Sequence, residues 1–247
     1  MTVRFVDCRY DLAEPARARE RYLQGHIPGA AFLDLERDLS DLSFPAEVAG
    51  RHPLPSAQQL AEAASRAGIG EDTLVVAYDE GMTGGAARLW WLLRHYGHER
   101  VGVLDGGLSA WAGPLASGEE PIEPAVFHPR ERSGDIATAE EILDRLGDPR
   151  LCLVDARTPD RFQGRETGLD PVAGRIPGAV NVPYTLGLWA AIPPVVLEAE
   201  DIVCYCGSGV TACVTLLALA RRGREDARLY PGSWSEWSRK GLPIEQG

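Results

Sequence analysis

Short apolar, β-branched runs alternate along the chain with segments of helical periodicity. The runs that predict strands are 3–8, 74–78, 101–104, 152–154, 180–182, 202–205 and 228–230. The segments that predict helices are 56–67, with Ser56 as N-cap, 86–96, 138–146 and a stretch that begins at 212. This alternation predicts an α/β fold in which mostly parallel sheets are flanked by helices and ligands bind at the carboxyl ends of the strands.

The same pattern occurs twice. Four blocks recur in one order, 6–9 as 154–157, 25–30 as 174–179, 74–79 as 201–206 and 106–111 as 232–237. Four matches in a constant order indicate an internal duplication. We therefore predict two homologous domains, residues 1–120 and 136–247. A linker at 121–135 joins them, within a Pro-, Gly- and Glu-rich stretch that has little periodicity.

The two halves differ in two places. The first half carries an additional stretch, roughly residues 34–52, between its Ile-Pro-Gly-Ala block and its central strand. The second half has the helical run 138–146 before its first strand, whereas the first half begins almost directly with a strand. The additional stretch is therefore a place where the halves can differ in function.

A cysteine stands at the end of the central strand of the second half. Cys206 follows the apolar run 201–205 and precedes the helix that begins at 212, in a turn that contains Gly207 and Gly209. Backbone N–H groups of such a turn and the helix N-terminus favour a thiolate, which is a nucleophile. The structural alternative is a buried cysteine that acts as a small hydrophobic residue.

The first half has a carboxylate at the matching position. Asp79 aligns with Cys206, and Glu80 follows it. Asp79 cannot attack sulfur, and Glu80 would repel an anion. We therefore expect one reaction centre, in the second half. If neither loop is catalytic, the glycines only form the turn.

Composition narrows the possible partners. The net charge of −11 disfavours nucleic acid and anionic membrane surfaces. No apolar run approaches membrane-spanning length, and the first residues do not resemble a secretory signal. The five cysteines have no framework spacing, which is typical of reduced thiols and predicts a cytoplasmic protein.

The loop 206–211, Cys-Gly-Ser-Gly-Val-Thr, resembles the active-site loop of rhodanese-type sulfurtransferases, in the form of the 3-mercaptopyruvate branch. Other blocks that resemble this family are 155–157, 161–164, 88–91, 104–107, 232–237 and the two Ile-Pro-Gly-Ala segments. The resemblance covers nearly the whole chain. It implies two tandem rhodanese-like domains, of which the first is inactive.

The resemblance implies sulfur transfer in two steps. The Cys206 thiolate takes a sulfur from a small anionic donor and becomes a persulfide, which passes it to cyanide, a thiol or a thioredoxin-like acceptor. Backbone N–H groups of the loop would hold the terminal sulfur, and these belong to Gly207, Gly209, Val210 and Thr211. Neither a metal nor an organic cofactor is implied. Thiosulfate-preferring relatives carry basic residues in this loop, so its lack of them favours 3-mercaptopyruvate, with thiosulfate as a possible donor.

The resemblance also implies roles for residues outside the loop. Ser208 would work with His52 and Glu36 as a proton relay; His52 and Glu36 both lie in the stretch found only in the first half. Arg161 would bind the donor's carboxylate or sulfonate. The structural alternatives are a solvated loop histidine for His52 and a surface salt bridge for Arg161.

The second arginine that mercaptopyruvate enzymes often carry after the Arg161 position has no clean match in this chain. Arg165 is the candidate that we assign to the donor, and Arg175 is an alternative.

Two other functions fit parts of the pattern. A Cys-dependent phosphatase has a related fold, but it requires a Cys-x5-Arg loop, and position 212 is Ala. A non-catalytic persulfide carrier or binding module would fit the shortened second half. Turnover with a sulfur donor distinguishes both from a sulfurtransferase.

Overall fold

The computed structural model describes residues 2–247, which form two compact units. The first unit comprises residues 2–41 and 54–132, and the second comprises 42–53 and 133–247. The segment 42–53, part of the additional stretch of the first half, thus packs with the second unit. Neither this packing nor the inclusion of residues 121–132 in the first unit follows from the repeat alone.

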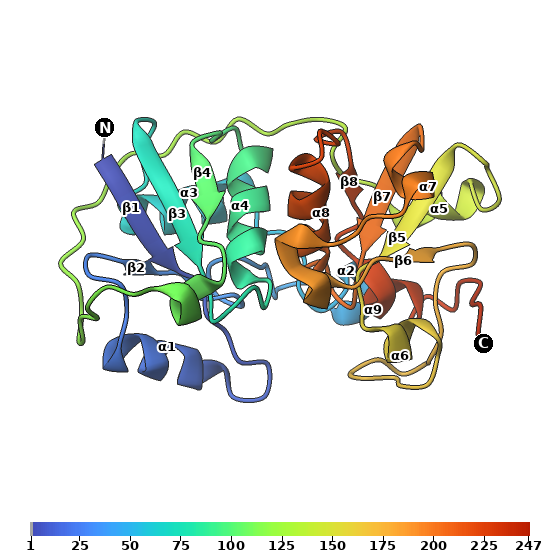
Figure 1. Ribbon diagram of the computed structural model, residues 1–247, viewed down its shortest axis with the longest axis horizontal. Coiled ribbons are helices and arrows are strands. Elements are labelled where there is room, and N and C mark those ends of the chain that lie inside the picture. Colours follow the sequence, from blue (N-terminus) through green and yellow to red (C-terminus); the bar gives the residue numbers. More distant parts are fainter. Residues whose placement is uncertain (1) are drawn as a thin grey trace. The chain divides into compact units, whose positions relative to one another are not determined.

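The first unit is built on four parallel strands in the order β2-β1-β3-β4. Its strands are β1 (Thr2–Asp7), β2 (Ala31–Phe32), β3 (Thr73–Tyr78) and β4 (Val101–Val103). Its helices are α1 (Pro15–Gln24), α3 (Ala57–Arg66), α4 (Gly85–His95) and the 3₁₀ turn η1 (Gly107–Ala110). Figure 1 shows α4 beside β4 and α1 below the carboxyl ends of the strands.

The second unit repeats this sheet in the order β6-β5-β7-β8, again with all pairs parallel. Its strands are β5 (Leu151–Asp155), β6 (Val180–Asn181), β7 (Asp201–Tyr205) and β8 (Arg228–Leu229). Its helices are α2 (Ala46–Ala49), α5 (Ala139–Asp144), α6 (Pro159–Phe162), η2 (Tyr184–Trp189), α7 (Pro194–Leu197), α8 (Ala212–Ala220) and α9 (Ser233–Trp237). The predicted duplication and parallel α/β fold are confirmed.

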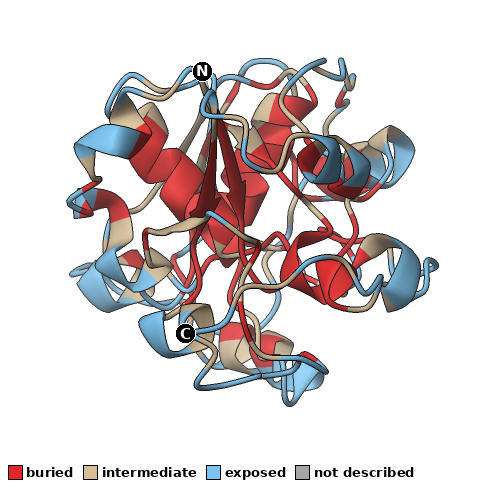
Figure 2. Cartoon of the chain, turned by 90° about the vertical axis from the view of Figure 1, so that its right-hand side faces the viewer, coloured by how far each residue is buried: buried red, intermediate tan, exposed pale blue. Residues whose placement is uncertain are grey.

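The central strands are buried because helices and loops cover both faces of each sheet. In β7, residues 202–205 are all buried, and the sequence there is correspondingly a continuous apolar run. Figure 2 shows buried strands in red at the centre, with exposed residues on the outer helices and loops. The core of the second unit also contains Tyr230, Trp234 and Trp237, which come from β8 and α9 or lie next to them.

The helices that were predicted are those with a clear apolar face or a cap. Ser56 caps α3, accepting from the N–H of Gln59 at 3.3 Å, and the Gln59 side chain accepts from the N–H of Ser56 at 2.7 Å. Helix α1 was not predicted. It buries only Ala18 and Tyr22, so the apolar face that would indicate a helix is small.

A buried ion pair closes the end of the first strand of each unit. Arg157 donates to Asp155 through Nε, at 3.0 Å to Oδ1, and through Nη2, at 2.6 Å to Oδ2, and also donates to the carbonyl of Gly174 at 2.7 Å. Arg9 makes the same contacts with Asp7 and Gly25. Each arginine thereby ties the strand to the Gly-x-Ile-Pro-Gly-Ala loop. Within residues 2–247, no helix is long and apolar enough to cross a bilayer.

Replacing Arg157 by Met should lower the free energy of unfolding by about 3–5 kcal/mol, because the fully buried carboxylate of Asp155 loses its counter-charge. Arg150→Met, at a side chain that is 68% exposed, should change it by less than about 0.5 kcal/mol. Urea denaturation measures both. If both variants lost the same free energy of unfolding, the buried ion pair would contribute no more to stability than an exposed one.

Candidate functional site

Cys206 lies where the sequence places it, between β7 and α8, and it is buried. The backbone N–H of Cys206 donates to Ser233 Oγ at 3.1 Å, and its carbonyl accepts from the N–H of Trp234 at 3.0 Å. The carbonyl of Gly207 accepts from the N–H of Ser235 at 2.9 Å. Helix α9 therefore fixes the start of the loop by three hydrogen bonds.

Two glycines are required by the packing of the loop. Gly209 has φ of 74°, and a Cβ there would lie 2.5 Å from the carbonyl oxygen of Pro231. A Cβ on Gly207 would lie 2.9 Å from Nη2 of Arg51 and 3.0 Å from Nη2 of Arg161. Gly207 thus leaves room for two guanidinium groups immediately beside the cysteine.

Three of the other thiols are held in their protonated form. Burial raises the pKa of Cys204 and of Cys8 well above the ordinary value, and Asp7 and Asp79 add to the effect at Cys8. Burial also raises the pKa of Cys152. These residues behave as buried hydrophobic side chains rather than as nucleophiles.

The matching loop of the first unit shows how such a turn holds a negative charge. Oδ1 of Asp79 accepts from the N–H groups of Gly81 at 3.1 Å and Met82 at 2.6 Å. Oδ2 accepts from the N–H groups of Gly84 at 3.0 Å and Ala86 at 3.3 Å. Four backbone donors therefore surround one carboxylate at the position of Cys206.

The backbone φ angles of the two loops agree at the third residue after Asp79 or Cys206 and differ at the fifth. Met82 and Gly209, each three residues after the matched pair, have φ of 67° and 74°. Gly84 has φ of 119°, whereas Thr211 has φ of −72°. The N–H groups of Ser208 and Gly209 therefore correspond to those of Gly81 and Met82, and the remainder of the turn is built differently.

His52 and Ser208 meet in the second unit. Nδ1 of His52 is 2.8 Å from Oγ of Ser208, and both side chains are buried. His52 reaches this position because segment 42–53 packs on α9, with the N–H of Arg51 donating to Oγ of Ser235 at 3.0 Å. A solvated loop histidine, the structural alternative for His52, does not describe this side chain.

Arg161 and Arg51 share one buried carboxylate beside the loop. Nη2 of Arg161 donates to Oδ2 of Asp170 at 2.8 Å, and Nη1 of Arg51 donates to Oδ1 of the same residue. The Asp170 side chain is fully buried, whereas the two arginines retain about a fifth of their exposure, at 18% for Arg51 and 22% for Arg161. The carboxylate holds both guanidinium groups in place next to Gly207.

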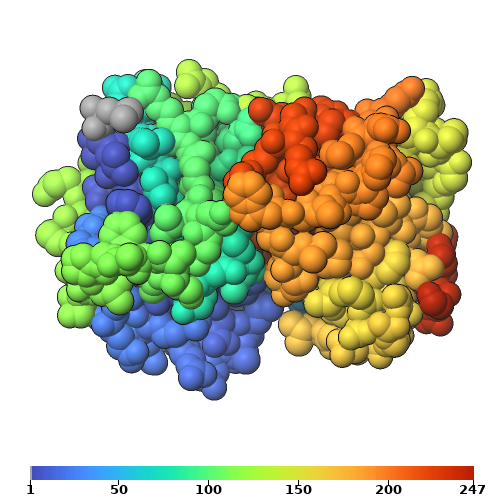
Figure 3. All heavy atoms as spheres, in the orientation of Figure 1, coloured from blue at the N-terminus to red at the C-terminus, as the bar shows by residue number. Residues whose placement is uncertain are grey.

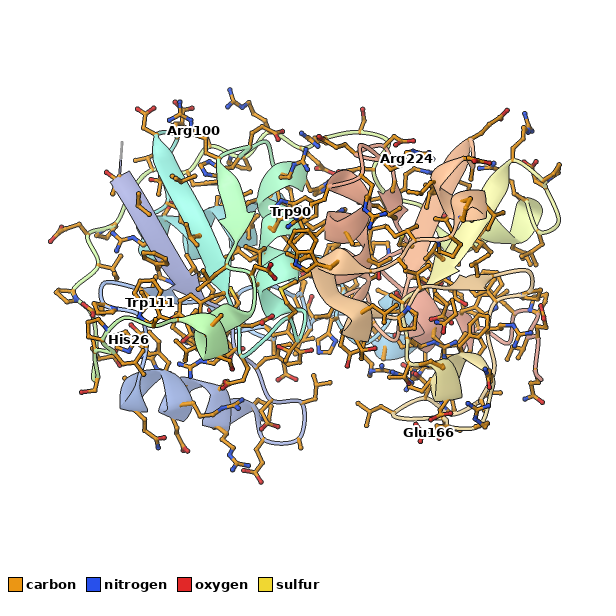
Figure 4. All side chains as sticks on the ribbon, in the orientation of Figure 1. His26, Trp90, Arg100, Trp111, Glu166 and Arg224 are labelled. Atoms are coloured by element: carbon orange, nitrogen blue, oxygen red, sulfur yellow. The ribbon has the colours of Figure 1, made fainter. Side chains whose placement is uncertain are left out.

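The structure does not bring Arg165 or Arg175 to this place. Arg165 pairs with Asp160 and Gln163, and its side chain is 58% exposed. Figure 3 shows the yellow chain around α6 at the surface, and Figure 4 shows the neighbouring Glu166 pointing outward. Arg175 pairs with Glu245. The assignment of Arg165 to the donor is therefore corrected, because its guanidinium is already paired on the outside of the unit.

Glu36 belongs to the first unit, where it lies in the turn after β2. Burial raises the pKa of its carboxyl, and the neighbouring Asp34 raises it further. A carboxyl shifted in this direction holds its proton more readily. Its membership of a relay with His52 remains a prediction.

Arg51 and Asp170 also lie beside the loop, and the sequence pattern did not predict them there. Arg51 directly precedes His52, and Asp170 ends the segment that holds Arg165. Arg51 could have been predicted from its position, because it lies in the additional stretch that also contains His52. Among residues 2–247, no group of three His, Cys, Asp or Glu side chains is arranged to hold a metal ion.

Comparison with known proteins agrees with this geometry. The family described as Rhodanese-like domain matches residues 2–114 and 138–240. A "Probable 3-mercaptopyruvate sulfurtransferase" of Pseudomonas aeruginosa is 42% identical, over 94% of this chain and 88% of that protein. The "Thiosulfate sulfurtransferase" of Rattus norvegicus is 34% identical, over 100% of this chain and 89% of that protein.

Among solved structures, SseA from Escherichia coli, described as a 3-mercaptopyruvate sulfotransferase, superposes with a TM-score of 0.78 and 31% identity. The match covers 94% of this chain and 92% of that one. The family matches once in each half of the chain, and the relatives match over nearly its full length. The chain is a member of the rhodanese-like family, with two tandem copies of the domain.

Proposed function

We propose that the protein is a sulfurtransferase that moves a sulfur atom from 3-mercaptopyruvate, through a Cys206 persulfide, to a thiol or cyanide. The observation that carries the proposal is the convergence on one loop of a cysteine, a Ser208–His52 pair at 2.8 Å and the Arg161 guanidinium beside Gly207. These groups supply a nucleophile, a proton carrier and an anion-binding site.

The first step forms the persulfide. The Cys206 thiolate attacks the sulfur of the donor, so that an S–S bond forms and the donor's C–S bond breaks. The electron pair of that bond passes to carbon as the enolate of pyruvate. The Ser208 hydroxyl delivers a proton that neutralises the developing negative charge, and His52 supplies a proton to Ser208 in turn. The Cys206 sulfur and the donor sulfur are each oxidised by one electron as the S–S bond forms, and the donor carbon is reduced by two.

The second step returns the cysteine to its starting form. An acceptor thiolate or cyanide attacks the outer sulfur, and Cys206 leaves as a thiolate. No other oxidant or reductant is consumed, because the sulfur carries its oxidation state to the acceptor. A thioredoxin-like protein is a suitable thiol acceptor.

Asp79 provides an internal analogue of the persulfide. A carboxylate oxygen of Asp79 is two bonds from Cβ, as the outer sulfur of a Cys206 persulfide would be. Oδ1 of Asp79 accepts from two consecutive loop N–H groups, and the matching groups in the second unit belong to Ser208 and Gly209. This likeness supports a role for the loop backbone, Gly207 to Thr211, in holding the anionic sulfur.

The donor preference rests on the Ser208–His52 pair. Release of pyruvate from 3-mercaptopyruvate requires a proton, whereas release of sulfite from thiosulfate does not. The loop also lacks the basic side chains that would attract a dianion. Thiosulfate is therefore the slower donor in this proposal. We also propose a cytoplasmic location, in keeping with five free cysteines, and no role for nucleic acid or membranes.

Cys206→Ser should abolish thiocyanate formation from either donor and cyanide, since a hydroxyl cannot carry sulfane sulfur. Intact-mass measurement should find one added sulfur atom on the reduced wild-type protein after 3-mercaptopyruvate and none on the variant. Sulfur addition without repeated turnover would identify a carrier instead. Cys206-dependent hydrolysis of an aryl phosphate would identify a phosphatase.

Ser208→Ala and His52→Asn should lower kcat with 3-mercaptopyruvate by about 100-fold or more, the usual contribution of a positioned proton donor. With thiosulfate they should change kcat by less than about fivefold, since the leaving sulfite needs no proton. Steady-state thiocyanate assays with both donors provide the comparison. Equal losses with the two donors would show that the pair only shapes the loop. Glu36→Gln, measured in the same assay, tests the third member of the relay.

A further inference from the structure

Both ring nitrogens of His26, a buried histidine of the first unit, face an oxygen atom. Nδ1 lies 2.7 Å from the carbonyl oxygen of Tyr22, and Nε2 lies 3.2 Å from Oε1 of Glu120. The His26 side chain has no exposed surface, and its ring stacks on the ring of Tyr22 with the centroids 4.1 Å apart. A backbone carbonyl only accepts hydrogen bonds, so the contact of Nδ1 with Tyr22 requires a proton on Nδ1.

The carboxylate on the other side of the ring is an acceptor as well. Oε1 of Glu120 also accepts from the N–H of Gly29 at 2.9 Å. This N–H group and the ring of His26 lower the pKa of the Glu120 carboxyl, which keeps it ionised at neutral pH. A neutral imidazole carries one proton, so either tautomer leaves one nitrogen lone pair against an oxygen lone pair. Only the imidazolium form satisfies both contacts.

The contact lies where the chain after η1 returns to the loop of His26. We call residues 114–120 the exit segment. The N–H of His26 donates to the carbonyl of Ala116 at 3.0 Å, and the N–H of Ala116 donates back at 2.9 Å. The N–H of Gly118 donates to the carbonyl of Leu23 at 2.8 Å. Figure 4 shows His26 above α1, beside the green chain of this segment. Most residues of the exit segment are exposed, so these few contacts hold it.

The second unit builds the same arrangement with a permanent cation. Arg175 matches His26 in the repeat, and it exchanges backbone hydrogen bonds with Glu245 at 2.9 and 3.0 Å. The N–H of Gly178 donates to Oε2 of Glu245 at 2.9 Å, as that of Gly29 does to Glu120. The guanidinium of Arg175 pairs with Oε1 of Glu245. Since arginine stays charged, this copy shows that a cation fits the position.

Few of the groups around His26 change their charge near neutral pH. Histidine is the side-chain type that ordinarily titrates between about pH 5 and 8. Burial raises the pKa of Tyr22 to about 12 and also raises that of Tyr78, so both phenols stay neutral in this range. The titratable and charged groups on the elements packed around His26 are Arg19, Arg21 and Tyr22 on α1, Arg4, Asp7 and Arg9 on or after β1, Tyr78 on β3, and Glu119 and Glu120 in the exit segment.

We propose that His26 and Glu120 form a proton-dependent clasp, which holds the exit segment while His26 carries both ring protons and releases it when one is lost. The stabilisation by the clasp is therefore lost as pH rises through the titration of His26. It is also lost as pH falls through the titration of Glu120, whose lowered pKa places that limit at acidic pH. The clasp of the second unit does not depend on pH at its cation. The inference goes beyond sulfur transfer and does not depend on the chemistry at Cys206.

Hydrogen exchange of single amides in the full chain, followed by NMR, tests the clasp. Between about pH 5.5 and 8, after correction for the intrinsic exchange rate, protection of the Ala116 and Gly118 amides should fall by about 10- to 100-fold. A hydrogen bond to a charged group contributes about this much. The amide of Ala125, which donates to the carbonyl of Ser65 at 3.0 Å in the same unit, is the reference and should change by less than about twofold.

His26→Arg is the matched variant, because it copies Arg175. It should keep the Ala116 and Gly118 amides protected to within about twofold at both pH values. Arg175→His is the reciprocal variant and should make protection of the Glu245 amide fall as pH rises. Unchanged protection of the wild-type exit segment would show that the proposal is wrong. So would a loss in His26→Arg as large as that in the wild type.

Glu120→Gln replaces His26→Arg if the latter does not fold, since the Glu120 side chain is 20% exposed. The amide of glutamine can donate to a neutral ring, so the fall in protection with rising pH should disappear. A fall as large as in the wild type contradicts the clasp. A parallel fall at Ala125 also contradicts it, because the whole unit rather than the exit segment would then open.

Discussion

Backbone N–H groups converge at the turn between the central strand of each unit and the helix that follows it. The position of the matched residues Asp79 and Cys206 depends on this turn. Both units build that turn at the end of a buried parallel strand, β3 or β7. In the first unit the turn carries Asp79, whose carboxylate accepts hydrogen bonds from four backbone N–H groups. In the second unit the turn carries Cys206, on which we propose that sulfur is carried. The same turn thus holds a carboxylate in one copy and the proposed nucleophile in the other.

The duplication also separates the supply of functional groups. Residues 133–247 of the second unit provide Cys206, Ser208 and Arg161, while segment 42–53, which residues 54–132 separate from them in the chain, provides Arg51 and His52. Asp170 is the link between them, because its two oxygens bind one arginine from each source. A single fully buried carboxylate therefore orients both cations beside Gly207. The first half, which has Asp79 at the position of the cysteine, thus contributes Arg51 and His52 through its additional stretch.

Much of this could be predicted from the sequence. The repeated blocks indicated two domains, and the apolar runs gave the strands other than β2, which has only two residues. Strands buried on both faces leave a continuous hydrophobic signal. The loop 206–211 indicated the nucleophile, and its resemblance to rhodanese-type sulfurtransferases indicated His52 and Arg161. Arg51 was missed, and Arg165 was chosen wrongly. The position of Arg51 depends on packing of segment 42–53 against α9, which no local periodicity encodes, whereas Arg165 was chosen for its proximity to Arg161 in the chain. Helix α1 was missed because only two of its ten residues are buried.

We propose that the second unit holds sulfur as a Cys206 persulfide whose outer atom occupies the place that Oδ1 of Asp79 occupies in the first. The most direct test is a crystal structure of the reduced protein after reaction with 3-mercaptopyruvate in the absence of an acceptor. We predict electron density for one extra atom on Sγ of Cys206, within hydrogen-bonding distance of the N–H groups of Ser208 and Gly209. Density on another cysteine, or an outer sulfur directed away from those N–H groups, would show that the persulfide does not form in this position.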